Sequence, residues 1–181
     1  MVGSVGVYTP PRNHRYIGPP ELRAAVRPGG EGRAIGSPAD FDAWAARRPP
    51  AELDEPFTFM VDAGGLLRLA PRRSEHVACA GGAPVLGAGE VAFARRAGRW
   101  TVGEVSNQST GYRPDPDASW PAVAAALDRA GLDRPAFFTH VLLFRLCTGC
   151  REQNTVHDLD FTCLFCGDPL PERWNADPHA P

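Results

Sequence analysis

The chain contains no lysine, because all nineteen of its cationic side chains are arginine. This absence excludes Schiff-base chemistry and lysine nucleophiles, both of which need a side-chain amine. A basic excess is also missing, since the formal net charge is −2. No global positive field therefore draws the protein onto nucleic acid.

Long hydrophobic runs are absent as well. The first residues lack the basic start and apolar stretch of a secretory signal, and residues 77–89 are uncharged but short and rich in glycine. The chain also lacks a Walker loop and a G-x-S-x-G nucleophile turn. With 43% hydrophobic and 22% charged residues it can still bury a core. We therefore expect a cytoplasmic protein with no membrane partner.

Four cysteines in the last third of the chain carry the strongest pattern. They form two C-x-x-C pairs, Cys147 with Cys150 and Cys163 with Cys166, and twelve residues separate the pairs. This spacing predicts one tetrahedral Zn²⁺ bound by four thiolates in a zinc ribbon. Coincidence or a thioredoxin-like redox pair is the alternative. A closed four-thiolate site has no open coordination position, so the expected role of the zinc is structural.

The charges around these cysteines bear on what the ribbon contacts. Carboxylates outnumber guanidinium groups there, and four thiolates with one Zn²⁺ add a further charge of −2. This balance disfavours contact with phosphates, so a structural role is favoured, followed by a protein-contact surface. A ribbon that reads nucleic acid stays an alternative. The charged residues are Glu152, Asp158, Asp160 and Asp168 against Arg145 and Arg151.

Hydrophobic periodicity predicts an α+β fold. Two hairpins are expected over 57–70 and 90–105, because apolar and polar residues alternate there around glycine-containing turns. Two helices are expected, one capped by Ser37 and one that begins at Ser119 and ends at Gly131. Strands over 137–146 and 155–162 would then deliver the two cysteine pairs.

The expected organisation is a small twisted antiparallel β domain with two helices, followed by a C-terminal zinc ribbon. Frequent prolines and glycines mark residues 1–36 as an irregular arm. The α+β domain is expected over 37–136, the zinc ribbon over 137–175 and a short tail over 176–181.

A polar segment, Ser106-Asn107-Gln108-Ser109-Thr110-Gly111-Tyr112-Arg113-Pro114, follows the last strand of the second hairpin. Its hydroxyls and amides suit a loop that binds ribose, phosphate or amide groups. Equally, they suit a strand-to-helix connection whose side chains satisfy the local backbone. Both interpretations stay open, and the candidate cofactor- or partner-binding residues are Ser106, Asn107, Gln108, Thr110 and Arg113.

Residues 57–114 carry three short motifs in a fixed order. His76-Val77-Ala78-Cys79-Ala80-Gly81-Gly82 comes first, Gly87-Ala88-Gly89-Glu90 follows, and Ser109-Thr110-Gly111-Tyr112-Arg113-Pro114 closes the segment. In order and spacing they resemble a β-rich domain of the plant IQ-motif calmodulin-binding proteins, which also occurs in bacterial effector-like and toxin-like proteins. The calmodulin-binding element itself has no counterpart here. The resemblance implies a common site lined by His76, Glu90, Ser109 and Tyr112.

Two kinds of function are compatible with these patterns. We expect a zinc-containing binding or adaptor protein whose partner is a protein or a nucleotide-like small molecule. The alternative is an enzyme for ribosyl-transfer-type chemistry, in which Glu90 steadies a ribosyl cation and Tyr112 stacks on a ring. The enzyme requires His76, Glu90, Ser109 and Tyr112 to meet in one cleft. The sequence does not determine the oligomeric state.

Overall fold

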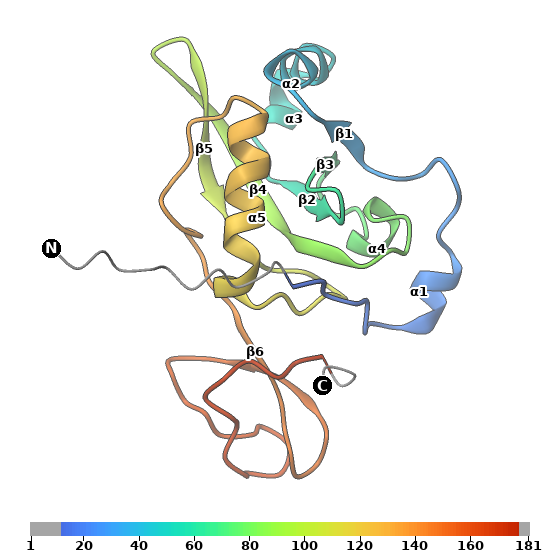
Figure 1. Ribbon diagram of the computed structural model, residues 1–181, viewed down its shortest axis with the longest axis vertical. Helices are drawn as coiled ribbons and strands as arrows, with labels where there is room; N and C mark the ends of the chain where they lie inside the picture. Colours follow the sequence, from blue (N-terminus) through green and yellow to red (C-terminus); the bar gives the residue numbers. More distant parts are fainter. Residues whose placement is uncertain (1–11, 178–181) are drawn as a thin grey trace, which may run out of the picture.

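The computed structural model describes residues 12–177. In this range a five-stranded antiparallel sheet has the order β1-β3-β2-β4-β5, and a separate two-stranded sheet pairs β6 with β7 (Figure 1). This arrangement of helices and antiparallel sheets confirms the α+β class. The helices are α1 (Pro20–Ala24), α2 (Pro38–Ala45), α3 (Pro50–Leu53), α4 (His76–Cys79) and α5 (Pro116–Arg129). The strands are β1 (Arg33–Ile35), β2 (Phe57–Asp62), β3 (Leu67–Ala70), β4 (Val85–Arg96), β5 (Arg99–Val105), β6 (Leu143–Leu146) and β7 (Gln153–Val156).

Alternating side chains in β2 show that both faces of the large sheet are covered near its centre. Phe57, Phe59 and Val61 belong to a core cluster that includes residues of α2 and α5. Met60 points the other way, into a second cluster with Val77 of α4. Helices α2 and α5 therefore cover one face of the sheet, and α4 covers part of the opposite face.

The two predicted hairpins are confirmed. β2 pairs with β3, and β4 pairs with β5 through a turn at Ala97 and Gly98. These two residues have φ values of 48° and 79°, as a tight two-residue hairpin turn requires. β4 begins earlier than expected, at Val85, so the glycine-rich stretch contributes to the sheet.

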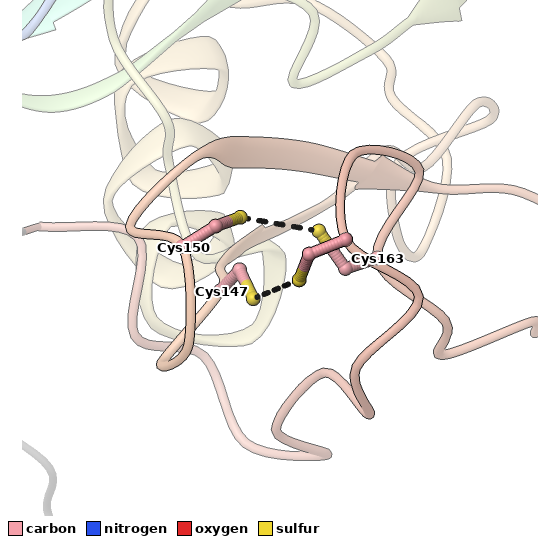
Figure 2. A group of neighbouring side chains, drawn as sticks. Cys147, Cys150 and Cys163 are labelled. Carbon is pink, nitrogen blue, oxygen red and sulfur yellow. Dashed lines mark hydrogen bonds between the residues drawn. The ribbon is translucent and has the colours of Figure 1, made fainter.

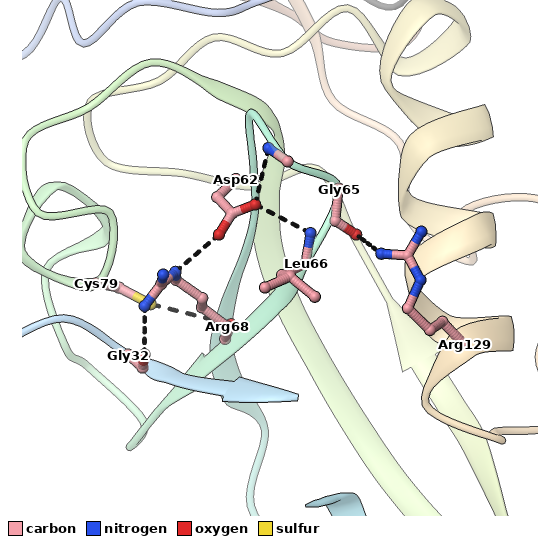
Figure 3. Close-up of polar contacts among 8 residues, drawn as sticks. Gly32, Asp62, Gly65, Leu66, Arg68, Cys79 and Arg129 are labelled. Atoms are coloured by element: carbon pink, nitrogen blue, oxygen red, sulfur yellow. Dashed lines mark hydrogen bonds and ion pairs between the residues drawn. The ribbon is translucent and has the colours of Figure 1, made fainter. Parts of the chain in front are cut away.

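Asp62 fixes the turn between β2 and β3 (Figure 3). Its carboxylate accepts hydrogen bonds from the N–H of Leu66 and from the Arg68 guanidinium, both at 3.0 Å. Arg129 of α5 donates to the Gly65 carbonyl at 2.8 Å. The tip of this hairpin is thereby tied to the helix that covers the sheet.

Helix α2 begins where it was predicted, with the Ser37 hydroxyl capping its first turn. Helix α5 ends before Gly131 as expected, but its predicted start at Ser119 is wrong. The helix begins at Pro116, because Asp115 acts as the N-cap and proline suits the first helical position.

The strands of the small sheet are shorter than predicted. Residues 137–142 do not extend β6, because the N–H groups of Thr139 and His140 donate to the Val105 carbonyl at the end of β5, at 2.8 and 3.2 Å. The strand expected over 155–162 is β7, which ends at Val156. Positive φ values of 50° and 59° at residues 158 and 159 turn the chain there.

Strand β1 lies within the range expected to be an irregular arm, and it pairs with β3 at one edge of the sheet. Residues 1–11 of that arm and 178–181 of the expected tail lie outside the described residues. Between residues 12 and 177, none of the helices combines the length and apolar content needed to cross a bilayer.

Candidate metal centre

Each C-x-x-C pair lies on a tight turn, and the two turns share one hydrogen-bond pattern. In the first turn the N–H of Arg151 donates to the Cys147 carbonyl at 3.1 Å. In the second the N–H of Gly167 donates to the Cys163 carbonyl at 3.0 Å. The fourth residue after the leading cysteine has a positive φ in both turns, 64° at Arg151 and 79° at Gly167. The two turns are therefore equivalent structures that face each other.

The four sulfur atoms converge on one point between the turns (Figure 2). The Cys147–Cys166 and Cys150–Cys163 Sγ pairs are each 3.6 Å apart, and all four atoms lie within 4.8 Å of one another. Tetrahedral zinc with Zn–S bonds of about 2.3 Å places its sulfurs about 3.8 Å apart. Disulfides need about 2.05 Å, so all four thiols are free. Within residues 12–177 this is the one such cluster able to hold a metal ion.

Gly149 allows the two turns to approach each other closely. A Cβ at this position would collide with the carboxylate of Asp168, which follows the second cysteine pair. A carboxylate therefore lies directly against the first turn. A side chain at position 149 would displace the exposed Asp168 carboxylate from its place against the first turn.

Asn154 of β7 supports the second turn from behind. It is only 3% exposed, its Nδ2 donates to Cys163 Sγ at 3.5 Å, and its Oδ1 accepts from the Leu164 N–H at 3.0 Å. Sequence reasoning missed Asn154, although its place on the same strand face as buried Val156 was a signal. A polar residue on an inward strand face needs a partner, and here the partner is the cysteine turn.

The Cys163 sulfur is prepared to act as a thiolate. Burial raises the pKa of Cys163, but hydrogen bonds from the backbone N–H groups of Cys166 and Phe165, from the Cys150 thiol and from the Asn154 amide together lower it to about 6. Metal ions bind cysteine in its deprotonated form. Part of the ligand set is therefore ionised near neutral pH.

The C-terminal module, which comprises β6, β7 and the two cysteine turns, has a small apolar cluster of its own. Its buried cluster consists of Cys147, Val156, Cys163 and Leu170, with Leu143 and Phe161 packed against it. Two of these four buried residues are themselves metal-ligand candidates, and Phe144 and Leu146 of β6 are buried outside this cluster. So small a cluster cannot offset the entropy of ordering the module, and such modules usually rely on a metal.

Within the polar segment 106–114, Asn107 joins the large sheet to the chain that leads into the metal centre. It is 0% exposed. Its Oδ1 accepts from the Leu142 N–H at 2.7 Å, and its Nδ2 donates to the Leu142 carbonyl at 2.8 Å and the Pro114 carbonyl at 3.2 Å. The Asn107 amide thus makes the two backbone hydrogen bonds that a neighbouring strand would otherwise make with Leu142.

Arg113 makes a second connection to the C-terminal module. Its guanidinium donates to the Ser109 carbonyl at 2.8 Å and lies 5.1 Å from the centre of the Phe144 ring in β6. Burial lowers its pKa from the ordinary arginine value. The indole N–H of Trp174 donates to the Arg113 carbonyl at 2.9 Å. Arg113 and Asn107 therefore connect the polar segment after β5 to the C-terminal module and to the chain that leads into it.

The other candidate binding residues of the segment differ in accessibility. Ser106 is buried, and its hydroxyl accepts from the N–H groups of Glu90 and Gln108 at 3.4 and 3.3 Å. The side chains of Gln108 and Thr110 are exposed, and the Thr110 hydroxyl donates to Glu75 at 3.1 Å. Ser106 therefore satisfies backbone N–H groups in β4 and in the loop after β5, whereas the Gln108 side chain is exposed.

Three of the four candidate catalytic residues are buried. His76 is 3% exposed and its Nε2 lies 3.0 Å from the Gly89 carbonyl oxygen, while burial lowers its pKa. Tyr112 is 0% exposed, and its hydroxyl donates to the Ala83 carbonyl at 2.7 Å. Burial raises the Tyr112 pKa. The Ser109 hydroxyl is also buried and accepts from the Tyr112 N–H at 3.3 Å.

The fourth candidate, Glu90, lines a cleft of about 620 Å³ on the open part of the sheet. β4, β5 and residues 139–142 form its walls, with Glu104, Gln108 and His140 among the lining side chains. Neither Glu104 nor His140 belongs to a sequence motif, and His140 lacks metal-ligand spacing to the other histidines. The strand register was the available signal, since it places Glu104 on the same sheet face as Glu90.

The segment that carries the resemblance, residues 57–114, folds as β2 through β5 with the following polar loop. Its three motifs occupy α4, the first half of β4 and the loop after β5. These placements do not test the resemblance, which stays a prediction. Among known proteins, no family model, no curated protein and no solved structure matches this chain.

Proposed function

We propose that the chain is a binding module of the reducing cytoplasm, stabilised by one structural Zn²⁺ in a C-terminal zinc ribbon. The convergence of four cysteine sulfurs to within 4.8 Å carries this proposal. Four thiolates in a tetrahedral arrangement favour Zn²⁺, because this soft ligand set suits zinc better than it suits calcium or magnesium. A reducing compartment favours metal binding over disulfides.

The closed ligand set supports a structural role for the metal. All four positions are supplied by protein sulfur, so no place is left for a water or a substrate. Because the module's own apolar cluster is small, metal binding would supply most of its stability. In small zinc modules this amounts to about 10–16 kcal/mol of apparent folding free energy.

A binding function has more support than an enzymatic one. The cleft of about 620 Å³ lies between the open sheet face and the chain leading into the ribbon, and it offers space to a protein segment or a small ligand. The ribosyl-transfer alternative requires His76, Ser109 and Tyr112 to reach a substrate, and all three are 5% exposed or less. A ribbon that reads nucleic acid is disfavoured by the excess of carboxylates around the cysteines.

Metal analysis of purified protein, produced in zinc-containing medium, tests the proposal. We expect one zinc per chain, lost in Cys166→Ser and retained in Cys79→Ser, which removes the one cysteine outside the cluster. Strong chelation should unfold residues 140–171 while the five-stranded sheet persists, as followed by amide NMR signals. Protein without stoichiometric zinc, or equal zinc content in the two variants, would contradict the proposal.

A further inference from the structure

Two large apolar side chains on the second cysteine turn are exposed to solvent. Leu164 is 75% exposed and Phe165 is 65% exposed, and they occupy the two middle positions of the C-x-x-C pair. The first turn carries Thr148 and Gly149 at the same positions. The apolar character therefore belongs to one turn and is not required by the metal site. Exposed clusters of large apolar side chains often mark contact surfaces.

The backbone beneath this pair is held rigidly. The Leu164 N–H is bound by the buried amide of Asn154 at 3.0 Å, and the turn is closed by the hydrogen bond between Gly167 and Cys163 at 3.0 Å. A partner would therefore contact side chains whose backbone is already ordered. Binding loses less conformational entropy when the contact surface is already ordered.

The surroundings of the Leu164–Phe165 pair are acidic. The two cysteine turns carry the carboxylates Glu152 and Asp168 against one guanidinium, Arg151, whereas Asp158 and Asp160 lie at the other end of the β6–β7 hairpin. One of the carboxylates, Asp168, follows the pair closely and lies against Gly149 of the first turn. The proposed Zn²⁺ with four thiolates adds a further charge of −2. The partner of this surface should therefore be cationic, because opposite charges complement each other across an interface.

We propose that the Leu164–Phe165 pair is a docking site for a basic amphipathic segment of a protein partner. Apolar side chains of the segment would cover Leu164 and Phe165, and its arginine or lysine side chains would meet Asp168 and the other carboxylate at the cysteine turns, Glu152. This inference rests on the proposed zinc ribbon, which keeps the turn folded. Nucleic acid is disfavoured as the occupant, since its phosphates would face the same carboxylates.

The test uses the full-length, zinc-loaded protein and two synthetic probes. One is an 18-residue helical peptide of leucine and lysine, and the other has glutamate in place of lysine. The variant Leu164→Ser/Phe165→Ser removes the pair, and Leu159→Ser removes an equally exposed leucine, 75% exposed, from the turn after β7. Amide NMR titrations report where each peptide binds, and zinc is quantified on the same samples.

We expect the lysine peptide to shift the amide signals of residues 164–168 in the natural protein and in Leu159→Ser. Removal of the pair should weaken binding at least tenfold, and raising the salt concentration should also weaken it. Equal binding of the glutamate peptide, or no binding by zinc-loaded protein, would overturn the docking site and leave the zinc proposal intact. Peptide binding at residues 164–168 of protein lacking zinc would contradict the zinc proposal alone.

Two other occupants are distinguished by the same variants. Oligothymidine binding that is lost in Leu164→Ser/Phe165→Ser would assign the pair to single-stranded nucleic acid. Self-association that is lost in this variant, measured by sedimentation, would assign it to a second copy of the chain. Either result would overturn the proposed basic partner.

Discussion

Replacing Asn107 by alanine is expected to loosen the contact between the five-stranded sheet and the metal-binding module. The Asn107 amide is 0% exposed and makes hydrogen bonds of 2.7, 2.8 and 3.2 Å to backbone groups of Leu142 and Pro114. A neutral hydrogen bond contributes about 1 kcal/mol net, and a buried group left without its partner costs about 1–3 kcal/mol. We therefore expect Asn107→Ala to lower the free energy of unfolding by about 3 kcal/mol.

Asn107→Asp should cost more than Asn107→Ala. It keeps the acceptor for the Leu142 N–H, but it places a carboxylate oxygen against the carbonyls of Leu142 and Pro114, which both accept from the amide nitrogen. A buried carboxylate facing carbonyl oxygens is neither solvated nor hydrogen-bonded.

Urea unfolding followed by tryptophan fluorescence measures both effects, since Trp174 contacts the same loop through Arg113. Gln108→Ala is the matched control, because the neighbouring Gln108 side chain is exposed, and it should change stability by less than about 0.5 kcal/mol. If Asn107→Ala were as stable as this control, the conclusion that Asn107 joins the five-stranded sheet to the chain leading into the metal centre would be wrong.

Three further outcomes are expected. Burial lowers the pKa of His14 from 6.5 to about 4. Between pH 6.5 and pH 4 the unfolded chain therefore binds a proton at His14 that the folded chain does not bind. The free energy of unfolding should fall by about 3 kcal/mol over that range. His14→Phe should flatten this loss in urea titrations at several pH values, and an unchanged slope would exclude His14 as its source. Gly111→Ala should lower stability by about 1–3 kcal/mol, because a Cβ there would collide with the Tyr16 ring. Gly103→Ala, whose Cβ would lie 3.8 Å from its nearest neighbour, should be nearly neutral, and equal melting temperatures of the two variants would contradict this reasoning. If the enzyme alternative holds, a nucleotide present at ten times its Kd should raise the free energy of unfolding by about 1.4 kcal/mol, and the absence of any thermal shift would weigh against that alternative.

Features encoded by neighbouring residues could be predicted from the sequence. The hairpin turn at Ala97 and Gly98 follows from local turn chemistry, and the cap at Ser37 follows from its hydroxyl next to proline. The convergence of four sulfurs also has a local cause, because a C-x-x-C turn brings its two sulfurs together and only the meeting of two turns depends on the fold. These features need few long-range contacts.

Features that depend on distant partners could not be predicted. The segment before β6 is apolar enough for a strand, but Thr139 and His140 bond to Val105 and leave β6 short. Asn107 looked like a ligand-binding residue, and its partner Leu142 is thirty-five positions away in the sequence. Burial of His76 likewise depends on its contact with Gly89 in β4. Residue type alone did not distinguish a polar side chain that binds a ligand from one that joins two parts of the chain.

X-ray absorption at the zinc edge of the purified protein tests the metal centre most directly. Four sulfur ligands at about 2.3 Å are predicted, since the thiols of Cys147, Cys150, Cys163 and Cys166 already lie within 4.8 Å of one another. A spectrum with nitrogen or oxygen ligands in place of sulfur, or a sample that retains no zinc after reconstitution, would contradict the account.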